Sequence, residues 1–197
     1  RGAHRRRRCQ IEAAGKHPDT SAGEKLRQFD EARDRTDPLS AYRVALAGGN
    51  AANGRKIFRE RSDVSCIRCH VAQGEGGTVG PPLDGVGAKQ NREYLLEAIV
   101  APNAKIAPGF ESLVIETTDG RLSSGVFKKE DAKELVLLRP DADIEPDQQL
   151  VTIPKIQIKS RERGPSAIPD GLVLALSKGE LRDLIEFLAS LKEEPAR

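Results

Sequence analysis

The sequence predicts a mainly α fold that carries a small antiparallel β-sheet as an insertion, and is α+β overall. Apolar residues recur at helical spacing in three stretches, near residues 50–61, 91–100 and 177–191. Between the second and third stretch, from about 110 to 158, the apolar residues alternate with polar ones, as in strands. No stretch approaches the roughly 20 apolar residues that a membrane span needs.

Residues 1–47 are predicted to be a flexible lead-in with short helices. The first 22 residues are basic, then rich in small and turn-forming residues, with no apolar period. The basic run at 5–8 is expected to be a solvated tail. Leu26, Phe29 and Ala32 favour a short helix that ends before Pro38, and residues 39–46 favour a second.

The central helices are predicted from caps and apolar faces. In the stretch 50–61, Gly54, Ile57 and Phe58 share one face of a helix. Residues 74–83 are too rich in Gly and Pro for anything but an ordered loop. Asn91 is typical of an N-cap, and the helix after it runs to about 100, with three apolar residues facing inward: Leu95, Leu96 and Ile99.

The strands of the insertion, four or so, are expected within residues 110–158. Residues 113–117 alternate, and Asp119-Gly120 is a turn signal before a second strand at 121–128. Further strands are predicted at 134–139 and 149–158. Pro154 interrupts the last and lacks an N–H donor, which predicts a sheet edge.

A capping box opens the last helix, with Ser177 at the cap and Glu180 three residues later. An apolar stripe follows at helical spacing: Leu181, Leu184, Ile185, Leu188 and Leu191. The residues between them are predicted to lie outside the stripe: Arg182, Asp183, Glu186 and Lys192. Residues 193–197 are read as a tail.

Cys66-Ile67-Arg68-Cys69-His70 is a complete C-x-x-C-H motif, in a chain with only three cysteines and three histidines. Two thiols three residues apart can each add to one vinyl group of a single porphyrin. The histidine that follows then places its imidazole under the iron. We therefore expect one haem c, covalent through Cys66 and Cys69, with His70 as the iron ligand.

Two other interpretations of the cysteine pair are weaker. A thioredoxin-like redox motif needs a buried strand before it, whereas residues 59–63 are almost entirely charged. A structural zinc would need further ligands, and Cys9 with His4 or His17 fits no standard zinc spacing. Cys9 is expected to be a free thiol.

Net charge, composition and the N-terminal residues limit which other functions and locations are expected. The net charge is +2 with 31% charged residues, which gives no argument for nucleic-acid binding. Attachment of haem to C-x-x-C-H normally takes place outside the cytoplasm, so a periplasmic or otherwise extracytoplasmic location is expected. The first 35 residues hold no apolar leader and no initiator Met, so we expect a mature or excised piece of a longer protein.

The chain resembles class I cytochromes c, in which an N-terminal helix bearing Gly and an aromatic crosses a C-terminal helix. Gly54 and Phe58 match the first helix, and Leu184, Phe187 and Leu188 match the second. Gly80-Pro81-Pro82-Leu83 resembles the family's G-P-x-L segment. The resemblance implies that the Pro81 carbonyl accepts the second imidazole proton of His70, and that Leu83 packs on the porphyrin.

Residues 48–192 resemble more narrowly the C-terminal haem-binding domain of large secreted planctomycete and verrucomicrobial proteins. Matching stretches lie at 54–58, 66–70, 79–83, 91–99, 106–110 and 118–120, and in the last helix. That resemblance implies a β insertion at about 110–158. It also implies that residues 23–47 are the remnant of an upstream helical region.

The chain differs from this family at the residue that supplies the sixth iron ligand. The family has a Met there, before a Pro and shortly before the last helix. This chain reads Ser166-Ala167-Ile168-Pro169 and contains no Met. Ile168 cannot donate electrons to iron, and the loss removes the ligand that raises the potential of His/Met haems. The site is left open or water-bound, is filled by a partner, or takes one of four side chains: Lys155, Lys159, His4 or His17.

Two functions follow from these expectations. One is an electron carrier between a dehydrogenase-like partner or fused domain and a respiratory acceptor, not an enzyme unless as part of a larger dehydrogenase. The other is a five-coordinate haem sensor or weak peroxidase, motivated by Ile168, with Arg161 and Arg163 as the only nearby polar hints. A degenerate domain that keeps haem for structural reasons is a third reading.

Overall fold

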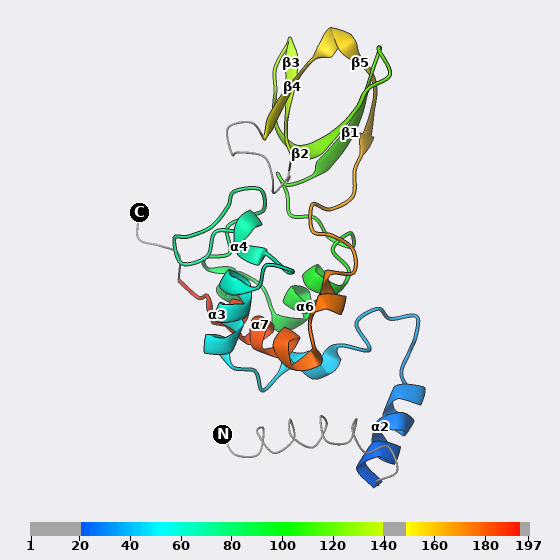
Figure 1. Ribbon diagram of the computed structural model, residues 1–197, viewed down its shortest axis with the longest axis vertical. Coiled ribbons are helices and arrows are strands. Elements are labelled where there is room, and N and C mark those ends of the chain that lie inside the picture. Colours follow the sequence, from blue (N-terminus) through cyan, green and yellow to red (C-terminus); the bar gives the residue numbers. More distant parts are fainter. Residues whose placement is uncertain (1–20, 140–148, 194–197) are drawn as a thin grey trace.

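The structure is a computed structural model that describes residues 21–139 and 149–193. Its longest helices are α2 (Ser21–Glu31), α3 (Ala51–Glu60), α6 (Arg92–Val100) and α7 (Lys178–Ser190). Single turns form α4 (Cys66–Cys69) and α5 (Val86–Lys89), and three short 3-10 helices are η1 (Arg43–Leu46), η2 (Lys155–Gln157) and η3 (Leu172–Ala175). Helices surround one centre, the sheet lies at one end of the molecule, and α2 lies at the other (Figure 1).

The crossing of α3 and α7 builds the main core. The rings of Phe58 and Phe187 lie 5.5 Å apart, centroid to centroid, and are tilted by 55°. Both side chains are buried. Gly54 faces the backbone of α7, and a Cβ there would overlap the Asp183 carbonyl oxygen, so a glycine is needed for this close approach. The predicted crossing is confirmed.

The predicted caps of α6 and α7 form, and α3 has a cap that was not predicted. Asn91 accepts a backbone N–H bond at the start of α6, and Asn50 accepts two at the start of α3. Ser177 and Glu180 form both bonds of the capping box of α7. The predicted apolar faces of these three helices are buried in the same core.

Two residues of α7 depart from the prediction. Arg182 and Asp183 were expected outside the apolar stripe, but 6% and 2% of their surfaces are exposed. Asp183 accepts hydrogen bonds from the Asn50 N–H at 2.8 Å and from the Asn53 amide at 3.2 Å. The Arg182 Nε donates to the Val44 carbonyl at 3.2 Å. Both polar groups are buried because they tie the segment before α3 and its first turn to α7.

The segment before α3 also enters the core. Leu39 and Ala45 are buried in the same cluster as the α3–α7 crossing, and Tyr42 and Leu46 pack against that cluster. The second helix predicted at 39–46 is only the 3-10 turn η1. Part of the predicted lead-in therefore packs on the helical domain.

The β insertion is larger than predicted. Its strands are β1 (Ser112–Thr117), β2 (Leu122–Glu130), β3 (Glu134–Leu138), β4 (Leu150–Pro154) and β5 (Ile158–Arg163). They pair antiparallel in the order β4-β3-β2-β1-β5. The predicted strand at 149–158 is wrong in its extent, because η2 breaks it and β5 returns to pair with β1. The strand that contains Pro154 is an edge strand, as predicted.

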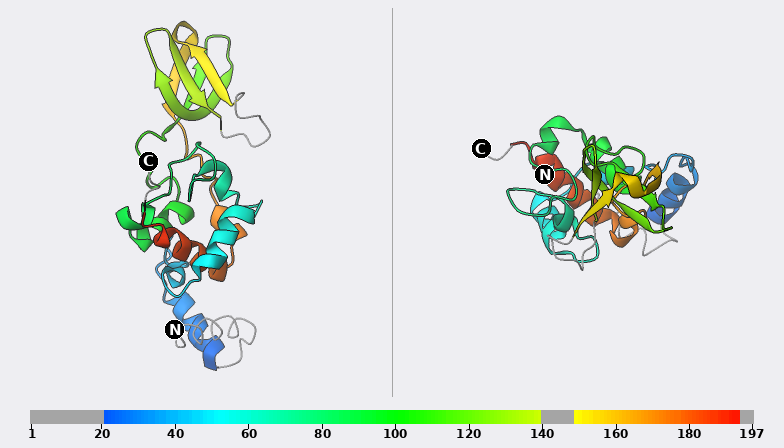
Figure 2. Two further views of the ribbon diagram at one scale, coloured as in Figure 1. Left: turned by 90° about the vertical axis from the view of Figure 1, so that its left-hand side faces the viewer. Right: turned by 90° about the horizontal axis from the view of Figure 1, so that it is seen from above.

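The sheet curls around a core of its own. Apolar residues from all five strands meet in one cluster, with Ile115, Leu135 and Leu137 fully buried in it. Glu130 on β2 reaches Arg161 on β5 at 2.7 Å and Lys155 on η2 at 2.8 Å, which ties the two sides of the curl together. The left view of Figure 2 shows the coiled sheet beyond the helices, at one end of the molecule. A sheet of this size makes α+β the better description than mainly α.

Candidate functional site

The C-x-x-C-H motif forms a single helical turn with the histidine just beyond its end. In α4, the His70 N–H donates to the Cys66 carbonyl at 3.1 Å. His70 itself has extended backbone angles, φ −120° and ψ 134°. The two thiols therefore lie at the start and the end of one helical turn, and the chain becomes extended at His70.

The Gly- and Pro-rich loop is fastened to this turn by backbone hydrogen bonds. Gly77 N donates to Ile67 O at 2.9 Å, and Gly80 N donates to Cys69 O at 2.8 Å. Leu83 N donates to the carbonyl of residue 71 at 2.8 Å. The predicted ordered loop is confirmed, and hydrogen bonds to the backbone of the motif and of residue 71 hold it in place.

The His70 ring is oriented by the contact expected for Pro81. Its Nδ1 lies 2.8 Å from the Pro81 carbonyl oxygen. Because a carbonyl only accepts, the proton stays on Nδ1 and the lone pair of Nε2 is left for a metal. Burial lowers the pKa of His70, so the ring is neutral, as a metal ligand must be.

Gly80 makes this contact possible. A Cβ on Gly80 would overlap the imidazole ring, with Nδ1 only 2.7 Å away. The glycine before Pro81 therefore lets the loop backbone lie directly against the histidine. A side chain at this position would push the ring and the loop apart.

Both cysteines of the motif are unpaired and half-buried. Burial raises the pKa of the Cys66 thiol to about 11, and burial also raises the pKa of Cys69. The thiols are protonated at neutral pH, unlike the low-pKa cysteine of a thioredoxin-like site. Among the residues described, no cluster of three His, Cys, Asp or Glu side chains is placed to hold a metal ion. The zinc alternative invoked Cys9, His4 and His17, which lie outside the described residues.

Both thiols and His70 open into one cavity of about 310 Å³ with a largely apolar lining. One wall consists of the motif and its loop, including Gly80, Pro81 and Leu83. The other wall comes from the end of α6 with the segment after it and from residues 166–169, including Ile168. All six residues expected from the sequence line this one cavity: Cys66, Cys69, His70, Pro81, Leu83 and Ile168.

Asn103, which the sequence reasoning missed, holds the segment around Ile168. Its Oδ1 accepts the Ser166 N–H at 2.7 Å, and its Nδ2 donates to both carboxylate oxygens of Asp170, at 2.8 and 3.0 Å. The Ile168 N–H donates to the Ser166 hydroxyl at 3.2 Å. One amide therefore binds the chain on both sides of Ile168. A lone Asn after a helix carries no signal that reveals such a contact.

The lysines expected to replace the missing ligand do not reach the cavity. Lys155 binds Glu130 at 2.8 Å, and Lys159 binds Glu116 at 2.6 Å, both on the sheet. Neither lines the cavity, so neither of these two alternatives for the sixth ligand is supported. The reason is that η2 and the start of β5 pair with the end of β1, at the end of the sheet far from the helices (Figure 1). His4 and His17 lie outside the described residues. Lys105 does line the cavity, with its ammonium bound to Glu97 at 2.7 Å.

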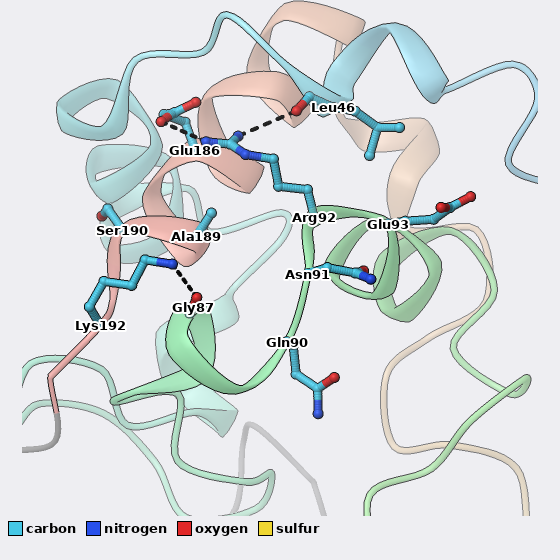
Figure 3. Close-up of a pocket in the computed structure, with 10 residues that line it drawn as sticks. All are labelled: Leu46, Gly87, Gln90, Asn91, Arg92, Glu93, Glu186, Ala189, Ser190 and Lys192. Atoms are coloured by element: carbon cyan, nitrogen blue, oxygen red, sulfur yellow. Dashed lines mark hydrogen bonds and ion pairs between the residues drawn. The ribbon is translucent and has the colours of Figure 1, made fainter.

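A second hollow, of about 730 Å³, lies between α6, α7 and the end of η1. Its lining mixes polar and apolar groups. Arg92, Glu186 and Lys192 bind one another or the backbone (Figure 3), and Glu93 pairs with Arg43. Arg92 pairs with Glu186 at 2.9 Å, and Lys192 donates to the Gly87 carbonyl. Because these groups are satisfied within the protein, the hollow is a junction between elements and the smaller apolar cavity is the candidate site.

Comparison with protein families places residues 51–137 in the Cytochrome c family model. The matched stretch contains α3, the motif, its loop and α6, and extends into β3. A comparison with curated proteins found no match. This match supports a cytochrome c domain in that part of the chain, and such a domain implies covalently bound haem c and haem-based electron transfer.

The donor set fits this group. Two unpaired thiols and a neutral imidazole with its Nε2 free open into one apolar cavity. An apolar pocket suits a porphyrin, and an apolar lining would limit the access of water to the bound group. Within residues 21–139 and 149–193, no helix is long and apolar enough to cross a bilayer.

Proposed function

We propose that this cytochrome c domain carries single electrons from a dehydrogenase-like partner or fused domain to a respiratory acceptor. In this proposal, haem attaches through Cys66 and Cys69 and its iron binds His70. The observation that supports it most strongly is the 2.8 Å contact between His70 Nδ1 and the Pro81 carbonyl, within the cavity that holds both thiols. When bound, haem c supplies an iron that alternates between ferrous and ferric.

The residues of the chain bind and orient the group. The Pro81 carbonyl keeps the His70 proton on Nδ1, which fixes the ring and makes Nε2 a better donor. Leu83 and Ile168 both line the cavity and would contact the porphyrin there. Since Ile168 has no lone pair, it excludes water without binding iron.

The narrower relationships are also part of the proposal. We place the haem domain at residues 48–192 and relate it to the C-terminal haem-binding domain of secreted planctomycete and verrucomicrobial proteins. A location outside the cytoplasm agrees with covalent haem attachment at C-x-x-C-H. The resemblance in the loop at 79–83 and in α6 supports this relationship.

A second candidate function is a five-coordinate haem sensor or weak peroxidase. The observation that favours it is that Ile168, where a Met ligand is expected, lines the cavity and offers no donor atom. Peroxide chemistry would need a polar group beside Ile168. Arg161, one of the two arginines considered for this role, instead pairs with Glu130 at 2.7 Å on the sheet. Binding of a small gas therefore fits this pocket better than peroxide cleavage.

Optical spectra of the haem-loaded protein, with and without carbon monoxide, distinguish the two functions. A low-spin ferrous form that is indifferent to carbon monoxide supports electron transfer with a side chain as sixth ligand. The variant Lys105→Ala would then test the lysine that lines the cavity. A high-spin ferrous form that binds carbon monoxide readily supports the sensor and counts against a dedicated carrier.

A further inference from the structure

The face of the sheet opposite to its own core meets the haem cavity. Val126 on β2 and Leu138 on β3 are 1% and 6% exposed, and both pack in one cluster with Val79. Val79 belongs to the loop that follows the C-x-x-C-H motif. The sheet therefore contributes two apolar side chains to the outside of the loop that covers His70.

The partners of these two side chains line the cavity themselves. Cys69, Phe110 and Ala167 pack against the same cluster, and all three, with Val79, line the cavity. Cys69 belongs to the motif, Phe110 to the connection from α6 to β1, and Ala167 to the segment that contains Ile168. Val126 and Leu138 of the sheet therefore cover the junction of these three segments, next to Cys69.

A polar contact fastens the rim of this junction. The Lys128 ammonium, on β2, donates to the Thr78 carbonyl at 3.2 Å and lies 5.5 Å from the centroid of the Phe110 ring. A cation over an aromatic face is attractive. The same strand therefore holds the loop and Phe110 together around the two apolar residues.

We propose that the sheet is the outer wall of the haem pocket at the Cys69 edge, and that Val126 and Leu138 raise the reduction potential by excluding water there. This inference rests on the proposed haem site. A porphyrin that is dianionic leaves ferrous iron neutral and ferric iron with a net positive charge. Water near the ring stabilises the charged form, so a dry apolar wall favours the ferrous form.

Adjacent leucines of β3 provide a matched test, because they face opposite sides of one strand. Leu138 packs toward the cavity, whereas Leu137 is fully buried in the sheet's own core. The holoprotein variants Leu138→Ala and Leu137→Ala are titrated with redox mediators. We expect Leu138→Ala to lower the ratio of ferrous to ferric protein at fixed potential about threefold. At 59 mV per tenfold for one electron, this is a shift of ~30 mV.

Leu137→Ala removes as many atoms and weakens the sheet, yet is expected to leave the potential unchanged. Equal shifts in both variants, or no shift in Leu138→Ala, would overturn the proposal. Val126→Thr is a second variant that keeps the side-chain volume and brings a hydroxyl to the wall, with Val151→Thr on the other face as its control. Val126→Thr is expected to lower the potential in the same direction. If wild-type protein shows no reversible one-electron couple, the proposed function fails instead.

Discussion

Replacing Gly54 with alanine tests the close crossing of α3 and α7 on which the haem domain is built. A Cβ at this position would overlap the Asp183 carbonyl oxygen and lie 2.7 Å from the Phe187 Cβ. The Asp183 oxygen belongs to the backbone of α7, so it cannot turn aside as a side chain would. The helices must separate or bend to accept the methyl group.

Two effects of opposite sign determine how much Gly54→Ala changes the free energy of unfolding. Alanine is favoured over glycine in a helix interior by about 1 kcal/mol. Overpacking of a core costs about 1–3 kcal/mol, and we take the upper end because the obstacle is backbone. The net loss in the free energy of unfolding is therefore about 2 kcal/mol. For a chain of this size it corresponds to a melting temperature lower by about 4–8 °C.

Thermal unfolding of the holoprotein, followed by circular dichroism, measures this loss. Ala52→Gly is the control, since Ala52 is exposed on the same helix. It removes a methyl group without changing the crossing and is expected to cost about 1 kcal/mol. If Gly54→Ala is as stable as wild type or more so, propensity outweighs packing and the crossing is looser than described.

Three further changes test the pocket and the sheet. Gly80→Ala places a methyl group against the His70 ring, and we expect a lower yield of haem-loaded protein and a changed absorption spectrum. Asn103→Ala removes the hydrogen bonds that hold the Ile168 segment, each worth about 1 kcal/mol. If this segment must move aside before carbon monoxide enters, each lost bond is expected to speed carbon monoxide binding to ferrous protein about fivefold. Glu130→Gln is expected to lower the melting temperature at pH 7 but not in strongly acidic solution. Hydrogen bonds from Lys155, then Arg161, lower the pKa of Glu130 below its usual 4.5, so the stabilisation is complete above that pH and is lost as the pH falls through the lower folded value.

Gly80→Ala and Glu130→Gln each have a control variant, and Asn103→Ala has an outcome that would contradict it. Gly74→Ala has open space around the added methyl group but a φ of +79°, so it shows the cost of backbone strain alone; an equal spectral change there would contradict the role of Gly80. For Asn103, unchanged carbon monoxide kinetics would mean that the Ile168 segment does not limit entry. For Glu130, the control is Glu162→Gln on β5, and a loss that persists unchanged in acid would show that the carboxylate charge is not the cause.

Local signals in the sequence predicted the helices well. Asn91 and Ser177 cap α6 and α7 as predicted, and the apolar face of residues 50–61 indicated α3, which begins close to its predicted start. The contact between His70 and Pro81 was also expected, from the resemblance of residues 80–83 to the G-P-x-L segment of class I cytochromes c. The helix caps, in contrast, depend on neighbouring residues only.

Long-range contacts escaped prediction. Arg182 and Asp183 are charged residues that are buried because they bind Val44, Asn50 and Asn53, more than 100 residues earlier in the chain. A hydrophobic pattern assigns such residues to the surface. The return of β5 along β1 likewise depends on pairing that a strand pattern cannot show, and it kept the strand lysines out of the cavity. The wall formed by the sheet arises in the same way.

The measurement that tests the central claim most directly is the covalent attachment of haem in the exported, haem-loaded chain. Denatured protein extracted with acidified solvent is assayed for haem that remains bound, and the bound haem is counted per chain. The account predicts one haem that resists extraction in wild type and in Cys9→Ala, and none in the double variant Cys66→Ala and Cys69→Ala. Extraction of all haem from wild type, or retention in the double variant, would contradict it.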